Sequence, residues 1–241
     1  FDKAGGIPAV MQRLGSIIDT DAVTYTGKKL KALLNKIKQS DDRVIRKLTD
    51  RVAPAPTISI LFGNIAPRGA VIKVAAASPH LLQHSGLAFV FDSYEDMLNS
   101  IDDENLPVDP STVLVLRNAG PKAVPGMPEW GMVPIPKKLR LQGIEDMVRI
   151  SDARMSGTSF GTVILHVAPE AALGGTFALI RTGDRITIDI PNRKLEADIS
   201  DDVLAERKAG WKAPAVIHKR GYPKLFIREV LQADEGCDFD F

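Results

Sequence analysis

The sequence predicts a β-rich α+β domain, either a barrel or a closed sandwich, with short helices at its rim. From residue 57 onward, short apolar or β-branched runs follow one another at close spacing, as the strands of such a domain do. The segments with helical character between these runs are short. The runs lie at residues 57–61, 70–75, 88–91, 112–116, 147–150, 162–167, 177–181, 185–190 and 194–199.

The first 56 residues have a different, helical character. Pro8 suits the first turn of a helix that ends at Gly15. Apolar residues recur at helical spacing within 28–38, and a short helix is expected at 44–48. Residues 40–56 are polar and then proline-rich, as a connector would be. We therefore expect residues 1–56 to be a helical linker or appendage from a preceding domain, and residues 57–241 to form the barrel-like domain.

Short helices are expected to interrupt the strands of this domain at residues 93–101, 137–142, 169–173 and 200–208. Ser200 is a good N-cap for the last of them, because acidic residues follow in the first turn. The sequence Thr182-Gly183-Asp184 indicates a tight hairpin between the runs at 177–181 and 185–190.

Composition restricts the class of protein. A chain of 241 residues can form one large domain, or one domain with an appendage. The formal net charge of +1 gives no electrostatic reason to expect a nucleic acid or an anionic membrane as partner. Without a membrane-length apolar run or a signal-peptide pattern, a cytoplasmic location is the default. The chain begins at Phe1 and not at a methionine, so we expect it to be a fragment of a longer protein.

Cysteine content limits the metal chemistry of the chain. Cys237 is the only cysteine, which excludes a disulfide within the chain. One thiolate is also too few for an iron–sulfur cluster that needs several.

Two polar stretches do not look like parts of an ordinary core. Residues 151–159 place hydroxyls, an acid, a base and a glycine between two apolar runs, which can present an oxygen atom to a ligand from a rigid scaffold. Residues 125–129 place the carboxylate of Glu129 in a loop stiffened by two prolines. By residue type alone, each is a weak signal, because an acidic loop residue is usually just solvated and Ser-Gly is a common turn.

The histidines leave other sites open. His80 and His84 are four residues apart, as metal-binding pairs often are, but the segment is broken by proline and no third ligand is evident. His166 ends an apolar run, which favours a satisfied, partly buried histidine. A Ser/His/Asp triad also stays open, although the glycine-flanked nucleophile elbow is missing.

The two polar stretches, taken with further motifs in the same order, resemble the C-terminal half of the dihydroxy-acid dehydratase / 6-phosphogluconate dehydratase family. Within that family the chain is most similar to the sugar-acid branch, the arabinonate or xylonate dehydratases. The resemblance covers nearly the whole chain. The matching residues are 4–8, 63–67, 69–73, 117–121, 125–129, 152–157, 166–171 and 184–186.

This resemblance implies a fold and an activity. The family's C-terminal half is similar to the swivelling β/β/α barrel of aconitase-like enzymes. Family enzymes remove water from a 2,3-dihydroxy acid and give a 2-keto-3-deoxy acid. They use Mg²⁺ and an iron–sulfur cluster, for which we expect the 2Fe-2S type over 4Fe-4S. The implied partners are a sugar acid and the chain's own N-terminal domain, in a homodimer or homotetramer.

The resemblance also implies roles for three residues. Ser156 corresponds to the family's base, and Glu129 to a ligand of magnesium, which prefers hard oxygen donors. Thr158 lies beside the base in the sugar-acid branch and is assigned to substrate binding. A serine is a weak base unless nearby positive charge lowers its pKa.

Two departures from the family pattern affect this interpretation. The family's cluster cysteines and its other magnesium ligands, including a modified lysine, belong to the N-terminal half, so this chain alone is expected to be inactive. Ala153 and Met155 replace the glycine and phenylalanine of the branched-chain enzymes, which favours a sugar acid. The alternatives are a dihydroxy-acid dehydratase of branched-chain amino-acid biosynthesis, or a catalytically silent assembly domain.

Overall fold

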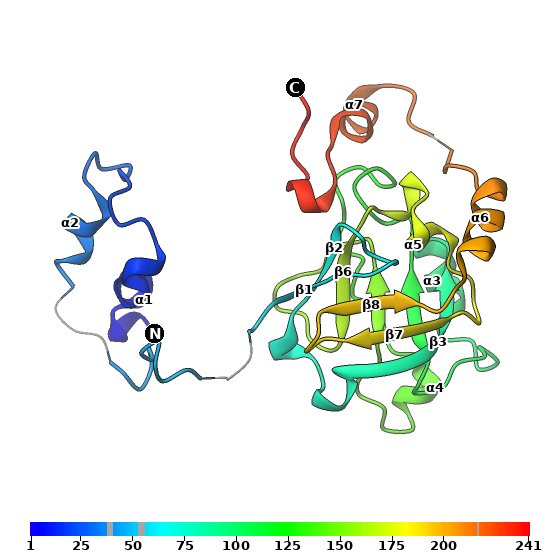
Figure 1. The fold of residues 1–241 in the computed structure, drawn as a ribbon, viewed down its shortest axis with the longest axis horizontal. Helices are drawn as coiled ribbons and strands as arrows, with labels where there is room; N and C mark the ends of the chain where they lie inside the picture. Colours follow the sequence, from blue (N-terminus) through cyan, green and yellow to red (C-terminus); the bar gives the residue numbers. More distant parts are fainter. Residues whose placement is uncertain (38–40, 53–55, 216) are drawn as a thin grey trace. The chain divides into compact units, whose positions relative to one another are not determined.

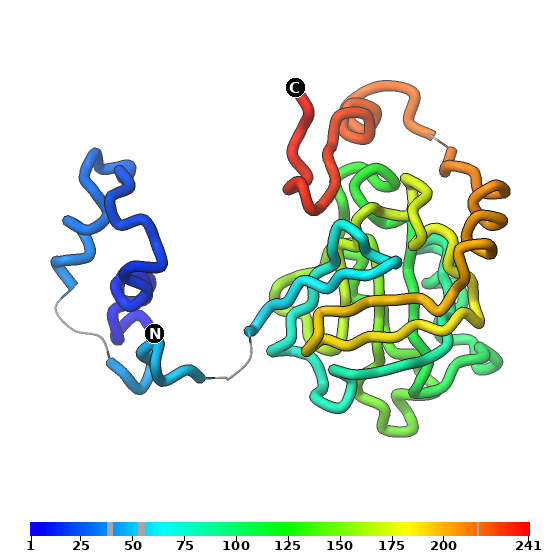
Figure 2. Tube along the Cα trace, in the orientation of Figure 1, coloured from blue at the N-terminus to red at the C-terminus, as the bar shows by residue number. Residues whose placement is uncertain are grey.

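A computed structural model describes residues 1–37, 41–52, 56–215 and 217–241 (Figure 1). The chain divides into two compact units, Phe1–Ala55 and Pro56–Phe241. Figure 2 traces the path of the chain within each unit. Among the described residues, no helix combines the length and the apolar character needed to cross a bilayer.

The first unit is a small helical assembly. It contains α1 (Gly6–Leu14) and α2 (Leu30–Leu34), with 3₁₀ turns η1 (Asp2–Ala4) and η2 (Gly15–Ile17). Ala4, Ala9 and Ile45 form its buried core. The helix at 6–14, with Gly15 at its C-terminal cap, confirms the expectation for Pro8.

Two helix predictions in this unit need correction. The helix expected over 28–38 is shorter, because Lys29 is extended and pairs with Val23 in an isolated β-bridge. Residue 38 lies outside the described residues, as do residues 40 and 53–55 of the expected connector. Residues 44–48 form turns, a bend and irregular backbone, and not a helix. Ile45 is the one buried apolar residue of this stretch, since Val44 and Leu48 are exposed. Burial of a single side chain does not require the chain to continue as a helix.

The second unit is an eight-stranded mixed sheet with the strand order β1-β2-β6-β5-β4-β3-β7-β8. Strands β3 to β6 pair in parallel in the order β3, β4, β5, β6, and the other pairs are antiparallel. The strands are β1 (Ser59–Leu61), β2 (Gly69–Ile72), β3 (Gln83–Phe91), β4 (Val113–Leu116), β5 (Arg149–Ser151), β6 (Val163–Ala168), β7 (Arg185–Asp189) and β8 (Lys194–Ala197).

The two edge strands meet, and the sheet becomes a nearly closed barrel. Directly after β1, the Phe62 amide donates to the Arg193 carbonyl at 2.8 Å, and the Leu195 amide donates to the Phe62 carbonyl at 2.8 Å. In Figure 1, β7 and β8 pass in front of the parallel strands, as this closure requires. The barrel prediction is therefore confirmed. Closure removes the exposed edges that an open sheet would present to other chains.

Short helices lie around the barrel. They are α3 (Tyr94–Ser100), α4 (Lys137–Arg140), α5 (Thr176–Leu179), α6 (Asp201–Gly210) and α7 (Gly221–Glu229), with 3₁₀ turns η3 (Val74–Ala76), η4 (Pro79–Leu81), η5 (Ala171–Leu173) and η6 (Ala233–Glu235). The Ser200 hydroxyl caps α6 by accepting from the Val203 amide at 3.5 Å, as the sequence predicts.

The strand expected at 177–181 is wrong, because most of that run belongs to α5. Its first four residues are all buried, so their pattern lacks the alternation that separates a strand from a buried helical turn. Residues 182–184 consequently join α5 to β7 and not two strands of a hairpin.

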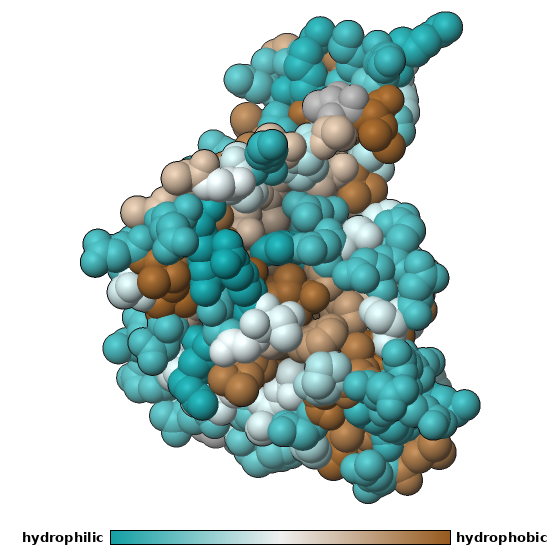
Figure 3. Space-filling model, turned by 90° about the vertical axis from the view of Figure 1, so that its right-hand side faces the viewer, coloured by the Kyte–Doolittle hydropathy of each residue, from teal (hydrophilic) through white to brown (hydrophobic). Residues whose placement is uncertain are grey.

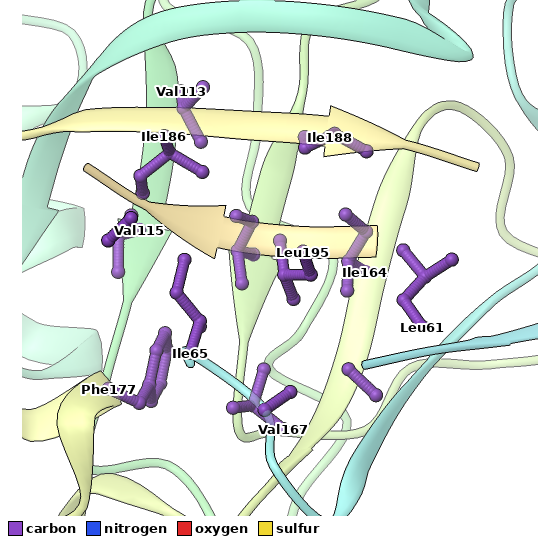
Figure 4. Close-up of a cluster of buried hydrophobic side chains, with 14 of the residues drawn as sticks. Leu61, Ile65, Val113, Val115, Ile164, Val167, Phe177, Ile186, Ile188 and Leu195 are labelled. Carbon is purple, nitrogen blue, oxygen red and sulfur yellow. The ribbon is translucent and has the colours of Figure 1, made fainter. Parts of the chain in front are cut away.

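The core consists of two layers separated by the sheet. Val113 and Val115 of β4 point into the barrel, whereas Leu114 and Leu116 pack in a second cluster with Met97 of α3. Figure 4 shows side chains of the inner layer from several strands pointing toward one another. Alternate residues of a strand point to opposite faces, so β4 stabilises both layers. The face shown in Figure 3 is mostly hydrophilic, with apolar side chains in its middle and in further patches toward its edges.

We expect Gly63→Ala to destabilise the barrel. A Cβ at Gly63 would overlap the Leu195 carbonyl that lies beside the closure, and the residue has a φ of 156°. Overpacking of this kind costs roughly 2 kcal/mol or more of unfolding free energy. Urea unfolding of the chain measures the effect. Gly210→Ala is the control, because no atom lies within 4 Å of its Cβ position. Equal stability of the two variants would contradict the closure argument.

Candidate active site

The polar motifs singled out in the sequence meet at one edge of the sheet. Strands β4, β5 and β6 are parallel, so their carboxyl ends lie side by side. Residues 117–121 follow β4, residues 152–159 follow β5, and residues 169–171 follow β6. In parallel sheets, ligands bind outside the carboxyl ends of the strands.

Asp152 joins these three strand ends. Its side chain is buried, and its carboxylate accepts hydrogen bonds from the amides of Asn118 at 3.2 Å, Ala119 at 2.9 Å and Ala171 at 3.0 Å. Burial raises the pKa of Asp152 to about 6, and the backbone donors oppose that rise. The Asp152 carboxylate therefore fixes the positions of all three loops.

Glu170 is a second buried carboxyl beside Asp152. Burial and, to a smaller extent, the charge of Asp152 raise the pKa of Glu170 to about 8. Its Oε2 accepts from the Lys122 amide at 3.0 Å, and its own amide donates to Gln232 Oε1 at 2.9 Å. A side chain at Gly120 would overlap this carboxyl group. The residue type at position 120 is thus set by the Glu170 side chain.

Ser156 and Thr158 lie on a turn beyond Asp152, where the chain reaches the surface. The Ser156 side chain is half-buried and Thr158 is exposed. Their hydroxyl oxygens are 2.9 Å apart, and the Thr158 amide donates to Ser156 Oγ at 3.4 Å. The structure brings together two of the three site residues named from the sequence.

The loop that carries Glu129 is bonded to the same stretch. The Gly131 amide donates to the Arg154 carbonyl at 2.7 Å, and Arg154 Nε donates to the Met127 carbonyl at 2.6 Å. A Cβ at Gly131 would overlap Leu165 and crowd the Arg154 carbonyl, so the approach of the two loops requires glycine. Glu129 itself is exposed. Its carboxylate is available to a ligand on the loop adjoining the Ser156 stretch.

In the described part of the chain, the histidines are not grouped with enough further ligands to hold a metal ion. Across residues 1–37, 41–52, 56–215 and 217–241, no group of three or more His, Cys, Asp or Glu side chains is placed to hold a metal ion. His84 Nε2 lies 2.8 Å from the Ser111 carbonyl. His166 is partly buried, as expected, and burial lowers its pKa. One carboxylate such as Glu129 can supply only part of a metal's coordination sphere.

The family model for the dihydroxy-acid/6-phosphogluconate dehydratase C-terminal region matches residues 43–237. The chain belongs to this dehydratase family. It is 50% identical over 250 residues to the L-arabonate dehydratase of Azospirillum brasilense, a match that covers 100% of this chain and 43% of that enzyme.

Other relatives lie in both branches of the dehydratase family. The 6-deoxy-6-sulfo-D-gluconate dehydratase of Pseudomonas putida is 47% identical over 244 residues, covering 100% of this chain and 42% of the relative. The dihydroxy-acid dehydratase of Acetivibrio thermocellus is 39% identical over 237 residues, covering 97% of this chain and 42% of the relative. The chain thus spans about two fifths of the length of the curated relatives that it matches.

Sequence reasoning missed the two buried carboxyls of this dehydratase domain. Asp152 and Glu170 both lie in motifs that carry the family resemblance, but neither was given a role. Their partners are 19 to 62 residues away in the chain. The sequence did contain one sign of these buried carboxyls, namely an acidic residue at the end of a buried strand. Such a group must find hydrogen-bond donors nearby in the fold or become protonated.

The raised pKa of Glu170 predicts a pH dependence of stability. In the window from its ordinary value up to about 8, the folded state binds a proton that the unfolded state has lost, so stability falls as pH rises. The slope from this one group is up to about 1.4 kcal/mol per pH unit. Glu170→Gln resembles the protonated acid and should remove this contribution.

Urea unfolding of wild type and Glu170→Gln gives the free energy of unfolding at several pH values between about 5 and about 9. This range spans roughly the ordinary and the raised pKa of Glu170. The variant should match or approach wild type at the acid end and exceed it at the alkaline end. Parallel curves would show that Glu170 is ionised throughout.

Proposed function

We propose that this chain is the C-terminal part of a longer sugar-acid dehydratase, which converts an aldonate such as a pentonate to its 2-keto-3-deoxy acid. The hydroxyl pair of Ser156 and Thr158, on a turn at the carboxyl edge of the parallel strands, is the observation that carries the proposal. The identity of about half to an L-arabonate dehydratase supports the sugar-acid class.

Ser156 acts as the base in this proposal. In its deprotonated form, Ser156 Oγ takes the proton from carbon 2 of the substrate and becomes a neutral hydroxyl. The electron pair of that C–H bond forms the double bond to carbon 3 as the bond to the carbon-3 oxygen breaks. The departing hydroxide takes one proton, returned from Ser156 directly or through solvent, and leaves as water, which restores the deprotonated serine. The resulting enol tautomerises to the ketone. The Thr158 amide, which already donates to Ser156 Oγ, favours the deprotonated form of the serine.

Thr158 binds the substrate in this proposal, from the exposed side of the turn. Its hydroxyl lies beside the base and faces the surface, where the substrate hydroxyls would lie. This arrangement supports the role that the resemblance implies.

Glu129 would hold magnesium through one hard carboxylate oxygen, which suits the preference of this ion. When bound, magnesium and the iron–sulfur cluster supply positive charge at the substrate carboxylate and at the departing hydroxyl. The exposed position of Glu129 beside the Ser156 stretch fits a metal shared with another part of the enzyme.

The iron–sulfur cluster does not fit this chain. Cys237 is its one cysteine, and burial raises the pKa of that thiol, which disfavours the thiolate that a cluster binds. The Cys237 Sγ instead lies 3.6 Å from Met127 Sδ, beside the Glu129 loop. The cluster, of the 2Fe-2S type in this proposal, belongs to the preceding part of the enzyme, which we propose acts in the cytoplasm as a homodimer or homotetramer.

Two other functions remain distinguishable by experiment. A branched-chain dihydroxy-acid dehydratase is supported by the relative at 39% identity. Ala153, however, replaces the glycine of that branch. It is fully buried three residues before Ser156, so its methyl group adds a packing contact that a glycine would lack. A silent assembly domain would need neither Ser156 nor Glu129.

We expect Ser156→Ala in the full-length enzyme to abolish turnover while leaving the fold and substrate affinity nearly intact. Loss of a general base costs roughly a hundred- to ten-thousand-fold in rate. If Ser156 only donates a hydrogen bond, the cost is about tenfold. Exchange of the carbon-2 proton with deuterated solvent isolates the assigned step.

Ser159→Ala is the matched control, since it removes a hydroxyl from the same turn. Its carbon-2 exchange should stay close to that of wild type. An alanine at position 156 that exchanges this proton at the wild-type rate would assign the base to another group.

Glu129→Gln should weaken magnesium binding, because an amide oxygen lacks the charge that a hard cation prefers. Activity titrated against magnesium should show a higher half-saturating concentration and partial recovery at excess metal. Glu95→Gln, an exposed carboxyl on α3, is the control and should leave the titration unchanged. An unchanged titration for Glu129→Gln would remove it from the magnesium ligands.

A further inference from the structure

The segment that follows β2 runs beside the loop that carries Ser156. Gly161 donates from its amide to the Ala76 carbonyl at 2.8 Å, and the Ser78 amide donates to Thr162 Oγ1 at 3.2 Å. Lys73 reaches the same loop through its side chain, because its Nζ donates to the Gly157 carbonyl at 2.6 Å. Residues 73–78 therefore bond the loop at two places, at Gly157 and where the chain enters β6.

The end of this loop, residues 160–162, is held by contacts that do not involve Lys73. Asp146 and Arg149 form a buried ion pair with a 2.7 Å separation, and Asp146 also accepts from Thr162 Oγ1 at 2.7 Å. A Cβ at Gly161 would overlap the Arg149 guanidinium, and Gly161 has a φ of 97°. These contacts fix the loop where it enters β6.

The tip of the loop, residues 156–159, has far fewer contacts. Gly157 and Thr158 are exposed, and nothing lies within 4 Å of a Cβ position at Gly157. Within the tip, the Ser159 amide donates to the Ser156 carbonyl at 3.0 Å, in addition to the hydroxyl contacts of Ser156 and Thr158. Among the residues that the structure describes, Lys73 makes the one hydrogen bond that joins this tip to another element.

The charge of Lys73 is also not neutralised locally. In the described part of the chain, no carboxylate lies within ion-pair distance of its ammonium group. The hydrogen bond to the Gly157 carbonyl places this ammonium group next to the turn. Positive charge near a hydroxyl favours the loss of its proton.

We propose that Lys73 is a positioning residue for the dehydration, one that holds the Gly157 carbonyl and so fixes the direction of the Ser156 hydroxyl. The inference rests on the proposed role of Ser156. Lys73 acts through the backbone of the turn and does not itself touch the reacting atoms. Because misplacement of a reacting group by about 1 Å can cost roughly a hundredfold in rate, one bond at the tip is enough to matter.

Lys73→Met and Lys73→Arg in the full-length enzyme test the proposal. Methionine keeps the apolar stem and removes the donor, whereas arginine keeps a charged donor. We expect Lys73→Met to lower kcat and carbon-2 exchange about ten- to a hundredfold with little change in KM, since orientation of the base acts in the transition state. Lys73→Arg should recover most of that loss.

Lys138→Met is the matched control. Lys138 is also half-buried and donates from Nζ to backbone carbonyls, those of Glu104 and Leu106, on α4 and outside the Ser156 loop. It should have wild-type kinetics. A Lys73→Met enzyme with wild-type kcat would overturn the proposal, as would a kcat loss that Lys138→Met shares.

Hydrogen–deuterium exchange of the turn gives a readout without activity. Amides of residues 155–160 should exchange faster in Lys73→Met than in wild type or Lys138→Met, and unchanged exchange would refute the anchoring role. The kinetic measurements and the amide-exchange measurement also separate the role of Lys73 from the proposed function. A wild-type enzyme that dehydrates no sugar acid would overturn the catalytic role, while the exchange measurement still decides whether Lys73 holds the turn.

Discussion

The site edge of this barrel depends on the buried carboxylate of Asp152. Burying a charge is costly unless donors surround it, and three backbone amides from two other strand ends supply those donors. The interaction therefore joins loops that are remote in the chain and makes their relative position a condition of folding. Ser156 lies only four residues farther on, so the place where the chain leaves the core is fixed before the turn begins.

Glu170 adds a second buried carboxyl whose pKa of about 8 keeps it protonated at neutral pH. The neighbouring Asp152 is thereby spared a second full negative charge.

Support for the candidate site decreases from the barrel toward the surface. The strand ends are held by buried charge and by the closure at Phe62, and the end of the loop is held by the Asp146–Arg149 pair. Within the described residues, the tip that carries Ser156 has short local bonds and one contact from another element, that of Lys73. Such a gradient suits a group that must be oriented closely yet reach a substrate from outside the barrel. The Glu129 loop follows the same pattern, since its backbone is bonded to Arg154 while its carboxylate is exposed.

The sequence could predict the barrel because its strands are short apolar runs separated by turn residues, and β4 and β7 lie within the expected runs at 112–116 and 185–190. Local pattern failed where several apolar residues are buried on all sides, as in α5, because a buried helical turn and a buried strand look alike. It also could not show which distant residues bond. The partners of Asp152, the closure of β1 on β8 and the reach of Lys73 all depend on the tertiary fold. The roles of Ser156, Thr158 and Glu129 came from resemblance, and the structure adds the geometry in which those roles can be tested.

The hydroxyl pair carries a constraint on how the roles of Ser156 and Thr158 can be combined. The two oxygens are 2.9 Å apart, so one hydroxyl donates its proton to the other, and either of them could be the donor. If Ser156 is the base, the Thr158 hydroxyl must be the donor. Ser156 Oγ then accepts two hydrogen bonds, one from the Thr158 hydroxyl and one from the Thr158 amide. Two donors to one oxygen favour its deprotonated form. A threonine hydroxyl has one proton, so while it donates to Ser156 it can meet the substrate only as an acceptor. Thr158 would then recognise a donor on the substrate, such as a sugar hydroxyl, which a sugar acid offers in greater number than a branched-chain dihydroxy acid.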